Sequence, residues 1–209
     1  MVKTDHALER MIFFSDAVFA IAITLLVLEL KVPHLPKGSP DRAYLVELAN
    51  LFPSFMGYLI SFATIGIMWV NHHALFKYIR RVDRALLLAN LLLLMTISFL
   101  PYPTAVLAEH LPDADSRTPA AVFYGGTLVV IAISFNVLWW AARGRRRLIG
   151  ADAHPEGVRT ITFRYGMGPL SYGMATAVAL VNVWASLAIH LGLALMYALS
   201  ERREDGEEE

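Results

Sequence analysis

The chain has 209 residues, 56% of them hydrophobic, and 18 basic residues balance 18 acidic ones, so it carries no formal net charge. This composition is too apolar for an ordinary water-soluble domain, and several apolar runs approach the roughly 20 residues that cross a bilayer as a helix. The absence of cysteine excludes disulfide bonds and thiolate metal sites. We therefore expect an all-α membrane protein.

The first apolar segment, about residues 11–30, has a polar beginning. Arg10, Ser15 and Asp16 precede or open a run that is apolar over most of residues 17–28. A carboxylate so close to a membrane-length apolar run is costly in lipid, so Asp16 should face protein or water.

A narrow stripe runs along this segment. Ile21, Leu25 and Leu28 recur at helical spacing and share one face of a helix, with Thr24 beside them. The stripe could line a symmetric contact or a pore between several copies of the chain, where rings of aliphatic side chains would act as a dewetting gate. Alternatively, it packs against another helix of the same subunit, and Thr24 bonds its own backbone.

Five further spans are expected. The run from Tyr165 to Leu199 has no Asp, Glu, Lys or Arg, but as one helix it would be about 52 Å long, against a hydrocarbon core of about 30 Å. We therefore divide it by a turn near residues 181–184, and expect residues 201–209 to form a charged, disordered tail. The predicted spans are about 11–30, 45–71, 85–107, 120–142, 160–181 and 183–200, which together form one six-transmembrane-helix bundle.

The basic residues are distributed unevenly over the connecting segments. Six spans place both termini on one side, and 14 of the 18 Lys and Arg residues fall on that side. Because basic residues concentrate on the cytoplasmic side, we expect both termini in the cytoplasm.

Polar and aromatic residues gather at the end of the second span as Trp69, Asn71, His72 and His73. Adjacent residues diverge by about 100° on a helix, so the two histidines cannot readily bind one metal ion. We expect one imidazole to pair with Ser15 or Asp16 at the cytoplasmic end. Simple placement at the membrane interface and metal binding are the alternatives.

Two motifs carry a resemblance. The pattern R-x-x-x-F-S-D, formed by Arg10, Phe14, Ser15 and Asp16, resembles the signature that opens the first helix of the transmembrane-protein-175 family. The second span is similar to that family's W-x-x-H-H-x-x-F pattern, from Trp69 onward. The remaining four spans resemble the family only in length, order and loop charge.

The resemblance implies a homotetrameric, potassium-preferring cation channel whose pore is lined by the first helix of each subunit. The family's narrowest point is an isoleucine five residues after the signature aspartate, which is Ile21 here, and Thr24 would contribute to selectivity. Potassium ions would be the permeant species, with no cofactor and no metal site. The expected surroundings are the inner membrane of a bacterial cell, with membrane lipids and further copies of the chain as partners and no nucleic acid.

A proton-coupled transporter or cation exchanger is the alternative, with Asp16, His72 and His73 as its relay. Transporters often contain inverted repeats and helices broken near the membrane midplane. The sequence shows no clear inverted repeat, and its ionisable residues lie near span ends, which favours the channel. An enzyme is not expected, because no nucleophile–base set is evident.

Overall fold

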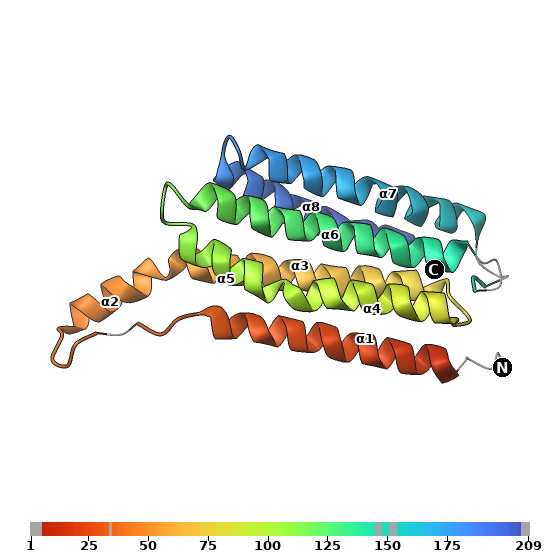
Figure 1. Ribbon diagram of the computed structural model, residues 1–209, viewed down its shortest axis with the longest axis horizontal. Coiled ribbons are helices and arrows are strands. Elements are labelled where there is room, and N and C mark those ends of the chain that lie inside the picture. The colour runs from red at the N-terminus through yellow and green to blue at the C-terminus, as the bar shows by residue number, and fades with distance from the viewer. Residues whose placement is uncertain (1–5, 34, 145–147, 151–153, 206–209) are drawn as a thin grey trace.

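The computed structural model describes residues 6–33, 35–144, 148–150 and 154–205 (Figure 1). In this part of the chain, helices form an elongated bundle, and the only strand-like feature is an isolated antiparallel bridge between Ile79 and Ile149. The expectation of an all-α protein is therefore confirmed. The elements are α1 (His6–Leu25), the 3-10 helix η1 (Leu26–Glu29), α2 (Asp41–Asn50), α3 (Phe52–Lys77), α4 (Arg84–Phe99), α5 (Pro101–His110), α6 (Arg117–Arg143), α7 (Pro155–Val178) and α8 (Val183–Asp205).

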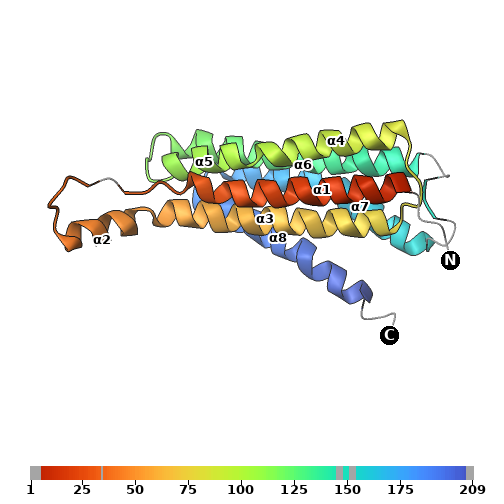
Figure 2. The same ribbon diagram turned by 90° about the horizontal axis from the view of Figure 1, so that it is seen from below.

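Four helical segments of the described chain are long and apolar enough to cross a membrane. They are His6–Glu29, Phe52–Lys77, Arg84–His110 and Arg117–Arg143. Helix α7 runs alongside them, whereas α8, whose apolar part is Val183–Met196, packs against α3 and α7 and slants away from the bundle toward its C-terminal end (Figures 1 and 2).

Prolines explain where the second and third helices differ from the expected bounds. The segment expected at 45–71 is divided into α2 and α3, because Pro53 lies in the first turn of α3, where the missing N–H is not needed. Helix α3 then continues to Lys77, so both adjacent histidines lie within it. Pro101 similarly separates α4 from α5 at Leu100.

The two ends of the chain also differ from the sequence expectation. The α-helical part of the first segment ends at Leu25 and tightens into η1. At the other end, α8 continues to Asp205, so part of the expected disordered tail is helical, and residues 206–209 lie outside the described residues.

Helix α6 forms the centre of the bundle and packs against α4, α5, α7 and α8. Its Tyr124 and Trp139 side chains are completely buried. Helix α1 lies on the outside of the bundle, where it packs against α3 and α4 (Figures 1 and 2). The start of α1 and the end of α8 lie at the same end of the bundle (Figure 1). This position of α1 leaves one of its faces uncovered.

Candidate functional site

One face of α1 is buried against α3 and α4. Its residues follow one another at intervals of three or four, as expected for one side of a helix. The face consists of Leu8, Met11, Ser15, Phe19 and Ala22, and Leu26 of η1 continues it.

A chain of hydrogen bonds joins this face to α3 and α4. The Nδ2 group of Asn90 on α4 donates to Oγ of Ser15 at 2.9 Å, and Ser15 donates to the Met11 carbonyl at 2.8 Å. Nε2 of His72 on α3 lies 3.0 Å from Oδ1 of Asn90. Because an amide oxygen only accepts, Nε2 of His72 carries the proton in this arrangement.

All three side chains of this network are buried, and each makes a hydrogen bond to another residue. A fully satisfied buried network specifies one arrangement of its helices, since any rotation would leave polar groups without partners. The His72 ring also packs between Phe19 of α1 and Phe76, with centroid distances of 5.3 Å and 4.5 Å. The network therefore fixes how α1 is rotated about its axis.

Asp16 makes a separate contact with α3. Its Oδ1 accepts a hydrogen bond of 2.8 Å from Nε1 of Trp69, at a half-exposed position. The Trp69 ring in turn lies near His73, with centroids 6.3 Å apart. The adjacent Ser15 and Asp16 of the first motif thus bond to different partners, Ser15 to Asn90 and Asp16 to Trp69.

The expected direct pairing of a histidine with Ser15 or Asp16 is not what the structure contains, because Asn90 stands between His72 and Ser15. Asn90 is not among the residues expected from the sequence. A signal was present, because Asn90 interrupts a leucine-rich run, and a lone amide in such a run needs a buried partner.

The opposite face of α1 is exposed and mostly apolar. Ile21 is 58% exposed, whereas its neighbour Ala22 is 1% exposed. Leu25 and Leu28 are also exposed. Although Leu28 lies in η1, three residues make one turn of a 3-10 helix, so Leu28 stays in line with Leu25. Arg10 and Phe14 are exposed as well.

Thr24 is exposed beside this stripe. Its Oγ1 donates to the backbone carbonyl of Ile21 at 2.9 Å. The donated proton leaves the oxygen lone pairs of the hydroxyl directed away from the helix backbone, where they can accept a hydrogen bond or contact a cation.

Among the residues that the structure describes, no hydrogen bond links the remaining motif residues, Asn71 and His73, to one another or to Asp16. Asn71 accepts a hydrogen bond of 2.9 Å at its backbone carbonyl from the Tyr165 hydroxyl, away from the Ser15 network. Asp16 contacts an indole N–H, which does not pass protons on to His72. Within the described residues, no three metal-binding side chains come together.

Comparisons with known proteins identify similar chains. A family model described as the endosomal/lysosomal potassium channel TMEM175 matches residues 10–101. A potassium channel of Chamaesiphon minutus is 45% identical over 186 residues, 89% of this chain and 91% of its own length. A potassium channel of Streptomyces collinus is 41% identical over 188 residues, 90% of each chain.

A solved structure extends the similarity to the whole fold. The crystal structure of a lysosomal potassium-selective channel TMEM175 homolog from Chamaesiphon minutus matches with a TM-score of 0.81 and 42% sequence identity. The match covers 94% of this chain and 98% of that one, so it reaches well beyond the two motifs in the first helices. This chain belongs to the family of the endosomal/lysosomal potassium channel TMEM175.

Proposed function

We propose that this chain forms a homotetrameric, potassium-preferring cation channel of a bacterial inner membrane, with a pore lined by α1. The observation that carries the proposal is the exposed apolar stripe of Ile21, Leu25 and Leu28, on a helix whose opposite face is buried against α3 and α4. One helix cannot enclose a path for ions, so several subunits must contribute. The similarity to relatives named potassium channels supports potassium as the permeant ion.

The stripe would act as a hydrophobic gate. Rings of aliphatic side chains offer no ligand to an ion, and a narrow passage between them loses its water. Ile21 is our candidate for the narrowest ring, because it lies near the middle of the apolar segment, five residues after the signature aspartate Asp16, and its side chain is exposed. The gate would open when these rings separate or rotate.

The hydrogen-bond network of Ser15, Asn90 and His72 would hold the gate residues in their orientation within each subunit. Because Ser15, Asn90 and His72 fix the rotation of α1, the stripe points away from the subunit's own core. Thr24, one turn from the gate, would offer its hydroxyl oxygen and thus partly replace the water around a passing cation.

The proposed topology has six spans, with both termini in the cytoplasm. The four apolar segments would cross the membrane together with α7 and α8. The start of α1 and the end of α8 lie at the same end of the bundle, in keeping with an even number of crossings (Figure 1).

Single-channel recording of the purified protein in planar bilayers tests the function. Discrete openings at currents of millions of ions per second are expected, and an exchanger cannot produce them. A stable monomer that still conducts, shown by native mass measurement, would overturn the tetrameric assembly.

The absence of cysteine allows a direct test of the pore lining. A charged thiol reagent should block conduction through Ile21→Cys, because this side chain would face the ion path. Ala22→Cys is the matched control, since Ala22 is buried against the subunit's own helices. If neither variant is blocked while both conduct, the stripe faces lipid and the proposal fails.

A further inference from the structure

A second exposed apolar row lies next to α1, along α2 and α3. Its members follow one another at alternating intervals of three and four residues, so they share one side of these helices. Leu51, which joins the two helices, keeps a helical backbone (φ −78°, ψ −3°), so the row continues from one helix to the other. Every member except the half-buried Gly66 is exposed. The row, called the α2–α3 seam below, consists of Leu45, Leu48, Phe52, Phe55, Leu59, Phe62, Gly66 and Trp69.

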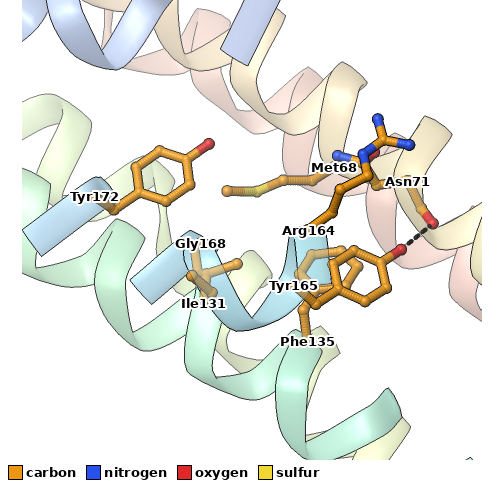
Figure 3. A pocket seen from close by; sticks show the side chains of 9 residues that line it. Met68, Asn71, Ile131, Phe135, Arg164, Tyr165, Gly168 and Tyr172 are labelled. Carbon is orange, nitrogen blue, oxygen red and sulfur yellow. Dashed lines mark hydrogen bonds between the residues drawn. The ribbon is translucent and has the colours of Figure 1, made fainter. Parts of the chain in front are cut away.

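The inner side of α3 is occupied within the subunit. Helix α3 packs against α1, α5 and α8. Near its end, the Tyr165 hydroxyl of α7 donates to the backbone carbonyl of Asn71 at 2.9 Å (Figure 3). The Met68 side chain lies beside the small cavity between α3, α6 and α7 (Figure 3). These contacts fix which side of α3 turns outward, and the seam lies on that side.

The seam borders the proposed pore helix. Nε1 of Trp69, its last member, donates to Oδ1 of Asp16 on α1 at 2.8 Å. Helix α1 lies between α3 on one side and α4 on the other (Figure 2). In a ring of subunits whose α1 helices surround a pore, each subunit meets two neighbours, one on either side of α1. The seam therefore lies where one of these neighbours is expected.

The α2 part of the seam extends out of the membrane-crossing part of the bundle. Helix α2 projects beyond the ends of the other helices (Figures 1 and 2), and its ten residues are about 15 Å long. None of them is buried, although Leu45 and Leu48 are apolar. A helix adsorbed to a membrane lies in the plane of its surface, whereas α2 continues roughly along the long axis of the bundle (Figures 1 and 2). Apolar side chains in this position need cover from protein, because acyl chains do not reach them.

We propose that the α2–α3 seam is an interface with a second copy of this chain, and that its α2 part surrounds the extracytoplasmic mouth of the pore. Because a ring joins unlike sides of its subunits, the seam would meet the α4 side of the neighbour, where Leu91 and Met95 are exposed. A Cβ at Gly66 would meet no atom of the described subunit within 4 Å, so this glycine leaves room for a neighbouring helix to come close. The inference rests on the ring of subunits around α1 proposed above.

Photo-crosslinking of the purified protein in lipid vesicles tests the interface. The photoreactive amino acid p-benzoyl-phenylalanine replaces Leu59 or, separately, Leu45, and reacts with whatever lies against it. Both proteins should yield covalently linked dimers and larger oligomers on a denaturing gel. Leu170 of α7 is the matched control, because it is 56% exposed, against 53% for Leu59, but lies on the far side of the bundle from α1 (Figure 1). Crosslinking from position 170 should yield monomers joined to lipid.

A charged substitution outside the membrane measures what the α2 part contributes. Leu45→Asp should raise the dissociation constant of the oligomer at least about tenfold, because a leucine loses its apolar cover. The side chain of Leu45 is exposed within the subunit, so the helix content measured by circular dichroism should not change. Asn50→Asp is the matched control, because it adds the same charge to an exposed position on another side of α2 and should leave dissociation unchanged. Native mass spectrometry over a dilution series in detergent measures both.

Lipid adducts alone from Leu59 or Leu45 would overturn the interface, and so would equal yields of oligomer from Leu59 and Leu170. Equal dissociation of Leu45→Asp and Asn50→Asp would also overturn it. These measurements require no ion flux. An oligomer that crosslinks through the seam but does not conduct would refute the channel and leave the interface standing. A conducting tetramer in which position 59 reaches only lipid would refute the interface alone.

Discussion

The two faces of α1 differ in how far residues of the same subunit cover them. The buried face meets its partners within the subunit, where Ser15 bonds to Asn90 and Phe19 packs against His72. The exposed face, with Ile21 and Leu25, is only partly covered by the described residues of the subunit. A helix that is fixed on one side by polar contacts can present a mostly apolar side in a defined direction. We infer that the R-x-x-x-F-S-D motif fixes the position of α1 within the subunit, whereas the stripe of Ile21, Leu25 and Leu28 lines the proposed pore.

The largest expected effect comes from placing a polar group in the exposed face. Ile21→Asn should wet the proposed constriction and raise the resting flux of potassium and sodium alike. Lowering the barrier by only about 1.4 kcal/mol would raise the rate tenfold, so we expect an increase of about tenfold or more. Flux into protein-loaded liposomes measures it, with assembly checked by size-exclusion chromatography. An assembled Ile21→Asn protein without a leak would show that α1 does not line the pore.

An asparagine at the next residue, Ala22, should lower the stability of the protein and should not open a leak. Ala22→Asn places an amide in the buried face, where it overfills the packing and has no hydrogen-bond partner. We expect a loss of about 3 kcal/mol in the free energy of unfolding. Thermal unfolding in detergent measures this loss. A leak equal to that of Ile21→Asn, with normal stability, would mean that the two faces are not distinct.

The network itself can be broken from α4. Asn90→Leu would leave Ser15 and His72 without their shared partner, at a cost of about 2–3 kcal/mol in the free energy of unfolding. Asn50→Leu is the matched control, because Asn50 is exposed at the end of α2. Similar melting temperatures for the two variants would show that the network does not hold α1 in place.

The stripe on α1 was accessible from sequence because it depends only on helical periodicity. Residues three or four apart share a face in any helix, so Ile21 and Leu25 could be grouped without a structure. The contacts of Ser15 could not be found in this way. Its partner Asn90 lies 75 residues away, and only the packing of α4 against α1 brings the two together.

Proline illustrates the same limit for helix boundaries. Pro53 and Pro101 both lie inside apolar runs, and each is compatible with a kink or with the first turn of a new helix. The structure places both in first turns. The choice depends on how the preceding segment packs, which for α2 means that it leaves the bundle and extends from its end (Figure 1).

The smallest expected effect lies at the border between the two faces, at Asp16. Its Oδ1 accepts a hydrogen bond from Trp69, and an asparagine at this position keeps an acceptor oxygen there. Asp16→Asn should therefore cost less than about 1 kcal/mol in the free energy of unfolding, since water also reaches this half-exposed site. Asp16→Ala, which removes the acceptor, should cost more. Both assembled variants should keep the wild-type ratio of potassium to sodium permeability, measured from reversal potentials. If Asp16→Asn alters that ratio without a loss of stability, Asp16 faces the ions and belongs to the exposed face of α1.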